Sequence, residues 1–288
     1  MATELNRPRV DEMDAAVAAM REWQIQGAPM QLHPGDIAWY RQLGAETAAA
    51  AVRTWSRDGR LLAVGLLDGP DVLRMTTAPD ARQDRELAER VVADVVDPDR
   101  GVLPEGAVNV EAPMDSLLQE LLPEHGWVSE DPWTPLRRDL ADPVEDPGLR
   151  IAVTDEALAP VQTAVHRSAF GSPGFTVERW RNMAAGPMFA DARCLLAYDA
   201  DGEAVATATV WSAGPGRPGL IEPMGVHADH RGKGHGRAMN LAAAAALREM
   251  GASSVIVCTP SSNPGGVAAY ASAGFRILPE VRDLCRKD

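Results

Sequence analysis

The chain has 288 residues, of which 45% are apolar and 24% are charged, and its formal net charge is −13. A net charge of this sign and size repels phosphate, which argues against general nucleic-acid or anionic-membrane binding. No apolar run is long enough to span a bilayer and the N-terminus lacks the apolar core of a signal peptide, so we expect a cytoplasmic protein.

The first half of the chain predicts a β-hairpin, a third strand, a helix, a fourth strand and a short helix, in that order. The hairpin turns at Asp58 and Gly59, and the helix places Leu87, Val91 and Val95 on one face. The corresponding ranges are 52–67, 71–78, 85–96, 107–112 and 118–127.

The second half repeats this order at a period of about 148 residues. Its hairpin turns at Asp201 and Gly202, and its long helix aligns Met239, Ala243, Leu247 and Met250 on one face. The ranges are 198–211, 219–226, 236–251, 253–259 and 268–275. The chain is therefore an internal repeat of one strand and helix pattern.

A stretch rich in Pro, Asp and Glu near the midpoint separates the two copies, and we place a linker at 141–148. The sequence therefore predicts two tandem domains, 1–145 and 149–288. Each is expected to be an α/β domain with a mixed, mostly antiparallel sheet flanked by helices.

A basic, glycine-rich loop, HADHRGKGHGRAM at 227–239, stands out in this acidic chain. Gly232, Gly234 and Gly236 follow a strand and open a helix, so backbone N–H groups can turn toward one point. The positive end of the helix adds to this attraction, which makes the loop a cradle for a phosphate or pyrophosphate. A Walker A loop is absent, and the spacing differs from the dinucleotide fingerprint; a basic helix start without a ligand is the remaining alternative.

Arg231, Gly234 and Gly236 fit an R/Q-x-x-G-x-G/A signature, and Asn263, Tyr270 and Gly274-Phe275 fit an N-x6-Y-x3-GF pattern. With these two motifs, the second half resembles the GNAT acetyltransferase superfamily. The match covers most of residues 149–288, and the tandem arrangement is similar to two-domain members of the superfamily. The resemblance implies that the loop binds the pyrophosphate of acyl-CoA, most often acetyl-CoA.

The resemblance also implies roles for single residues. Glu222 corresponds to a carboxylate base, and Tyr270 to the proton donor of the departing thiolate; an outward-facing strand-edge Glu and a packing Tyr are the structural alternatives. Asn263 either touches the cofactor or orders the following helix. The cofactor-binding residues that we expect are Met224, Gly225, Val226, Arg231, Gly232, Lys233, Gly234, His235, Gly236, Arg237 and Asn263.

These roles predict an acetyl-CoA-dependent N-acyltransferase that acts on a primary amine of a small molecule by direct attack in a ternary complex. We expect no metal, because His227, His230 and His235 lack ligand spacing, and we expect Cys258 to be a structural thiol. Neither nucleic acid nor a membrane is expected as a partner, and a homodimer stays open. The rival hypothesis is a non-catalytic acyl-CoA sensor or scaffold.

The stretch 166–183 is expected to form the lip of the acceptor site. There Phe170, Phe175 and Trp180 either line a pocket or pack in the core.

The first copy lacks the chemical groups of the second. Against the glycine loop stands ARQDREL at 81–87, whose Asp84 and Glu86 would repel a pyrophosphate. When the two copies are aligned, Leu73 corresponds to Glu222, Leu122 to Tyr270 and Asp115 to Asn263. We therefore expect the first copy to be a degenerate GNAT-like domain that shapes the acceptor site or mediates dimerisation.

Overall fold

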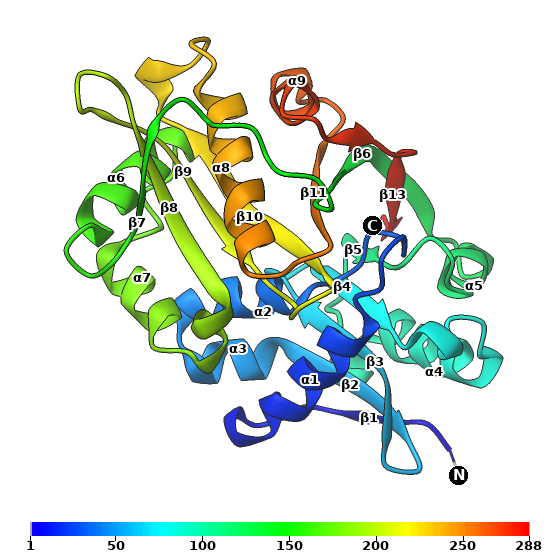
Figure 1. The fold of residues 1–288 in the computed structure, drawn as a ribbon. Helices are drawn as coiled ribbons and strands as arrows, with labels where there is room; N and C mark the ends of the chain where they lie inside the picture. Colours follow the sequence, from blue (N-terminus) through cyan, green and yellow to red (C-terminus); the bar gives the residue numbers. More distant parts are fainter. Residues whose placement is uncertain (1, 288) are drawn as a thin grey trace.

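A computed structural model describes residues 2–287. We call residues up to 145 the N-terminal half and residues from 149 the C-terminal half. Figure 1 colours the N-terminal half from blue through cyan to green, and the C-terminal half beside it from green to red. Among the described residues, no helix is long and apolar enough to cross a membrane.

The N-terminal half begins with a short strand and three helices, which precede the repeated pattern. Its elements are β1 (Glu4–Asn6), α1 (Met13–Trp23), α2 (Pro34–Tyr40), α3 (Ala45–Ala51), β2 (Val52–Arg57), β3 (Arg60–Leu67), β4 (Val72–Thr77), α4 (Arg85–Val96), β5 (Val108–Glu111), α5 (Leu118–Glu124) and β6 (Val128–Asp139).

The C-terminal half follows the same plan, except that it ends on two strands where the N-terminal half ends on one. Its elements are β7 (Arg150–Val153), α6 (Ala159–Phe170), α7 (Val177–Ala184), β8 (Ala192–Tyr198), β9 (Ala204–Trp211), β10 (Pro218–Val226), α8 (His235–Glu249), β11 (Ser254–Pro260), α9 (Pro264–Ser272), β12 (Arg276–Ile277) and β13 (Val281–Arg286). The mixed α/β fold with a mostly antiparallel sheet confirms the predicted fold class.

All strands of the described residues belong to one sheet, in the order β1-β2-β3-β4-β5-β13-β6-β11-β10-β9-β8-β7, with β12 beside β6. The neighbours are antiparallel except for two parallel pairs, β4 with β5 and β10 with β11. The parallel pairs occupy equivalent places in the two halves, as the repeat predicts. The boundary between the domains, placed at 145 and 149, stays a prediction.

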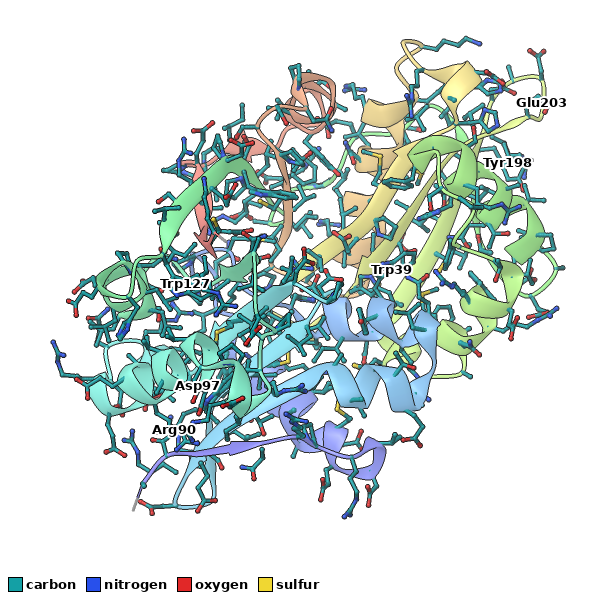
Figure 2. All side chains as sticks on the ribbon, turned by 180° about the vertical axis from the view of Figure 1, so that it is seen from behind. Trp39, Arg90, Asp97, Trp127, Tyr198 and Glu203 are labelled. Carbon is teal, nitrogen blue, oxygen red and sulfur yellow. The ribbon has the colours of Figure 1, made fainter. Side chains whose placement is uncertain are left out.

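The two halves exchange their last strands. Strand β6 pairs with β11 of the C-terminal half, and the chain's last strand, β13, lies between β6 and β5 of the N-terminal half. The guanidinium of Arg286 lies over the ring of Trp127, which Figure 2 labels, and donates to the carbonyl of Gly106 at 3.1 Å. A continuous backbone ladder thus joins the halves, which local sequence patterns could not specify.

Side-chain packing joins the halves a second time, through α2. The buried Gly35 lies so close to Trp211 of β9 that a Cβ on it would meet that side chain at 2.5 Å. The Trp39 ring lies 4.8 Å from that of Phe175 in the C-terminal half, at the junction visible in Figure 2. One hydrophobic cluster accordingly lies between the halves, and the core of each half also includes a residue of the other, Leu284 in the first and Leu136 in the second.

Candidate active site

The loop before α8 ends at a helix start that no side chain caps. Gly232 and Gly234 have φ values of 75° and 85°, a left-handed conformation that residues with a Cβ rarely adopt. Gly234 is the N-cap of α8 and offers no side-chain acceptor to the first N–H groups of the helix. These N–H groups therefore remain available to an external anion at the positive end of a 15-residue helix.

A groove of about 750 Å³ lies at this helix start. Every residue predicted to bind the cofactor lines it except Lys233, which is exposed on the loop. The lining residues are Ala169, Phe170, Met224, Gly225, Val226, Arg231, Gly232, Gly234, His235, Gly236, Arg237, Asn263, Gly265, Gly266, Ala268, Ala269 and Ser272. The structure thus brings ten of the eleven residues to one open space.

Two glycines set the walls of this groove. A Cβ on Gly225 would meet Ala169 at 2.6 Å, and a Cβ on Gly236 would meet Ala269 at 3.2 Å. Larger residues at these positions would push α6 and α9 away from the groove. Arg231 donates to the Ala169 carbonyl at 2.6 Å, so α6 anchors this guanidinium at the rim.

Asn263 caps α9 on the other side of the groove. Its side-chain oxygen accepts from the Gly266 N–H at 3.0 Å, and its amide nitrogen donates to the Thr259 hydroxyl at 3.3 Å. The side chain orders this helix and also lines the groove, so the geometry is compatible with both roles left open by the sequence.

The groove adjoins the point where β10 and β11 separate. Their ladder covers only Pro218–Leu220 against Ser254–Ile256, although β10 continues to Val226. The register with β9 shifts between Ile221 and Met224, a bulge that includes Glu222. Beyond Leu220, the edge of β10 that faces β11 therefore has no strand partner among the described residues.

Glu222 lies in this bulge and lines a second cavity, of about 420 Å³, between the halves. The Trp211 indole donates to the Glu222 carbonyl at 2.7 Å, which fixes the backbone there. Burial raises the pKa of Glu222, and the negative charges of Asp36, Asp68 and Glu111 raise it further. The charge of Arg74 lowers it, and the resulting pKa is about 7. A carboxyl group with this pKa exchanges protons near neutral pH, as a general base requires.

Tyr270 lies on α9 and lines neither the groove nor the cavity. It is 6% exposed and packs edge to face on Phe275 at 5.6 Å. Burial first, then the charges of Glu222 and Cys258, raises the pKa of its phenol far above the ordinary value. Tyr270 therefore stays protonated, which is the state that a proton donor needs.

Cys258 lines the same cavity as Glu222. Burial and the carboxylate of Glu111 raise the pKa of its thiol well above the ordinary value, so the unreactive thiol form dominates.

In the N-terminal half, the chain's own side chains occupy the place equivalent to the groove. The Asp84 carboxylate caps α4 by accepting from the Leu87 N–H at 3.0 Å. Arg82, the counterpart of Arg231, is 7% exposed and forms an ion pair with Asp115 at 2.7 Å. Only about 10 Å³ of space remains beside these groups.

The aromatic residues of the predicted acceptor lip differ in their exposure and in what they contact. Phe170 is 48% exposed and lines the groove, whereas Phe175 and Trp180 are buried in the cluster between the halves. Of the three histidines of the loop, only His235 lines the groove, and its ring lies 6.3 Å from that of His230.

Sequence reasoning missed the charged cavity wall that the N-terminal half contributes. Arg74, Glu111 and Asp68 line the cavity beside Glu222, although they come from strands and loops of the other half. The only local signal was the position of Arg74 directly after Leu73, the residue aligned with Glu222 in the repeat.

Comparisons with known proteins agree with this geometry. Residues 156–275 match the model of the acetyltransferase (GNAT) family. No curated protein sequence is significantly similar to the chain.

Three solved structures share the fold along nearly the whole chain. A GCN5-related N-acetyltransferase from Sphaerobacter thermophilus is 20% identical, with a TM-score of 0.58 and coverage of 99% of this chain and 95% of that one. A tandem GNAT protein from the clavulanic acid biosynthesis pathway is 16% identical, with a TM-score of 0.60 and coverage of 99% and 98%. FemX is 11% identical, with a TM-score of 0.60 and coverage of 98% and 96%.

The family match covers the loop, the groove and both predicted catalytic residues. Residues 156–275 thus match the acetyltransferase (GNAT) family, and the whole chain shares its fold with the tandem GNAT protein named above.

Proposed function

We propose that the protein is an acetyl-CoA-dependent N-acyltransferase that modifies a primary amine of a small molecule. Acyl transfer from acyl-CoA is the general chemistry of the family. The amine acceptor, the acetyl preference and the residue roles below are our proposal.

The residues of the groove fit an acyl-CoA. The uncapped start of α8 offers N–H groups to a diphosphate, and the glycines leave room for it where a side chain would intrude. Arg231 and Arg237 add positive charge at the rim, and Lys233 adds charge from the exposed loop. When bound there, acetyl-CoA supplies the thioester whose acyl group is transferred.

The free edge of β10 fits the acyl end of such a ligand. Met224, Gly225 and Val226 lie beyond the last residues paired with β11 and line the groove. N–H groups on a strand edge without a partner can hold an amide-containing arm and polarise a carbonyl oxygen. This places the reacting carbonyl, in our proposal, near the bulge that carries Glu222.

The cavity between the halves fits the acceptor. Six carboxylate side chains and two guanidinium groups line it, which favours a cation over an anion. They are Asp68, Glu111, Glu130, Asp131, Glu222 and Asp283, with Arg74 and Arg282. Glu222 would take a proton from the bound ammonium group, directly or through water, so that the neutral amine can attack.

Tyr270 would supply the proton that the departing thiolate needs. The phenol is protonated at neutral pH, and it belongs to the same hydrophobic cluster as Val257 of β11, against which Met224 of β10 packs. Direct attack needs no covalent enzyme intermediate and no metal; proximity of the two substrates does most of the work.

One observation carries this proposal. Glu222 and Met224, two residues apart on β10, line the acidic cavity and the glycine-rich groove respectively, so one short stretch of strand separates an acceptor space from a donor space. The N-terminal half, proposed here as a degenerate GNAT-like domain of residues 1–145, forms much of the acceptor wall. A cytoplasmic location and a homodimer stay predictions.

The test measures thiol release from acetyl-CoA in the presence of a panel of amines, with calorimetric binding of acetyl-CoA as a separate measurement. We expect amine-dependent release that Glu222→Gln and Tyr270→Phe abolish or strongly reduce. Binding of acetyl-CoA without release for any amine would favour the sensor or scaffold hypothesis. Unchanged turnover in both variants would refute the residue roles.

A further inference from the structure

Arg74 holds the carboxylates of the N-terminal half together at the cavity. Its side chain is 16% exposed and pairs with Glu111 at 2.8 Å, Asp36 at 3.0 Å and Asp68 at 3.4 Å. Three acidic partners around one cation leave a net negative charge beside the cavity. An arrangement of this kind needs the cation, because removing it would leave the carboxylates repelling one another in a partly dry site.

Arg74 and Glu222 line the same cavity from opposite halves. Other charged or titratable groups reach this region from every surrounding element. They are Asp36 of α2, Asp68 after β3, Glu111 of β5, Glu130 and Asp131 of β6, Cys258 of β11, Tyr270 of α9, and Arg282 and Asp283 of β13.

Arg282 also lines the cavity, where its guanidinium donates to the Glu130 carbonyl at 2.7 Å, but it is not among the charges that shift the pKa of Glu222. Burial raises the pKa of Glu222, and the nearby Asp36, Asp68 and Glu111 raise it further, whereas Arg74 lowers it. Among the described residues, Arg74 is thus the cation that offsets the negative charge around Glu222.

We propose that Arg74 is a positioning residue of the acyl-transfer site, which gathers Asp36, Asp68 and Glu111 and thereby keeps Glu222 able to accept a proton from the acceptor. This inference rests on the proposed function of Glu222 as the base. In this proposal the N-terminal half, which has no cofactor groove, sets the protonation of the base in the C-terminal half.

The experiment measures the titration of the Glu222 carboxyl group directly. Protein labelled with ¹³C at the Glu carboxyl carbons is titrated by NMR, and the Glu222 signal is assigned by its loss in Glu222→Gln. The variants are Arg74→Met, Arg74→Lys and Glu111→Gln. Arg57→Met is the matched control, because Arg57 has a similar exposure of 21% and an ion pair with Asp84 at 2.7 Å at the far end of β2.

Arg74→Met should raise the titration midpoint of Glu222 by about one pH unit, because the charge of Arg74 lowers the pKa of Glu222 and a nearby opposite charge typically shifts a pKa by about one to three units. Arg74→Lys keeps the charge and should restore most of the midpoint. Glu111→Gln removes a negative neighbour and should lower it, and Arg57→Met should leave it unchanged. If Arg74→Met does not fold, Glu111→Gln still tests the charge cluster, because an unchanged or higher Glu222 midpoint in that variant would overturn the proposal.

An unchanged midpoint in Arg74→Met, or a shift of equal size in Arg57→Met, would overturn the role of Arg74. This readout needs no turnover. Absence of amine-dependent thiol release would therefore refute the proposed function separately. With an active acceptor, the acidic limb of kcat/KM should move with the NMR midpoint, upward in Arg74→Met.

Discussion

Glu222→Gln should make the protein more stable while it makes the enzyme inactive. The folded protein raises the pKa of Glu222 from an ordinary 4.5 to about 7, chiefly through burial. A group whose folded pKa is raised opposes folding when it ionises. The cost is therefore absent below about pH 4.5, grows as the pH rises toward 7, and is fully present above it.

The size of this cost follows from the shift. One pKa unit corresponds to about 1.4 kcal/mol, so the full difference corresponds to roughly 3 kcal/mol. Glu222 faces a cavity and keeps part of its solvation, so we expect about 1–3 kcal/mol. Glutamine has nearly the same shape and no charge, and it avoids this cost at every pH.

The assay is denaturant unfolding of both proteins at pH 5 and pH 8. The stability advantage of Glu222→Gln should grow by about 1–3 kcal/mol between these pH values. Thiol release should fall by roughly 10²–10⁴-fold, the usual contribution of a general base. Glu203→Gln is the control, because Glu203 is exposed beside the β8 and β9 hairpin turn (Figure 2). An advantage that does not change with pH would refute the reasoning that Glu222 ionises at a cost.

Three further predictions follow from the groove and its counterpart. Tyr270→Phe should reduce turnover by about 10² while acetyl-CoA affinity stays near that of the wild type; normal turnover would exclude it as the proton donor. Gly236→Val should weaken acetyl-CoA binding at least about tenfold in calorimetry, because a Cβ there already meets Ala269 at 3.2 Å, and wild-type affinity would contradict the placement of the ligand. Asp84→Ala should lower the free energy of unfolding by about 1–3 kcal/mol through loss of the α4 cap and of the ion pair with Arg57, with no change in acetyl-CoA binding; altered binding would indicate a ligand site in the N-terminal half.

The sequence predicted the loop because its geometry is local. Glycines at 232 and 234 permit the left-handed backbone, and their spacing from the strand and the helix is visible in one short stretch. The repeat also indicated that the first copy lacks this loop, since its counterpart at 81–87 contains no glycine. Such features depend on residues that are close together in the chain, so they can be predicted from sequence patterns.

Features that depend on distant partners were not predictable. The place of β13 between β5 and β6 joins residues more than a hundred positions apart, and the strand's own pattern does not specify either partner. The role proposed for Arg74 depends on its ion pairs with Asp36 and Glu111, which lie on other elements. Trp180 could equally have lined a pocket, and only the packing of α7 between the halves buries it.

The central claim is that the start of α8 binds the diphosphate of acyl-CoA. Titration calorimetry with acetyl-CoA tests it most directly, on the wild type and on a variant with Arg231→Glu and Lys233→Glu. We expect saturable binding at one site per chain, a rise in melting temperature, and strongly weakened binding in the variant. No heat and no rise in melting temperature for the wild type, or equal binding by the charge-reversed variant, would contradict the claim.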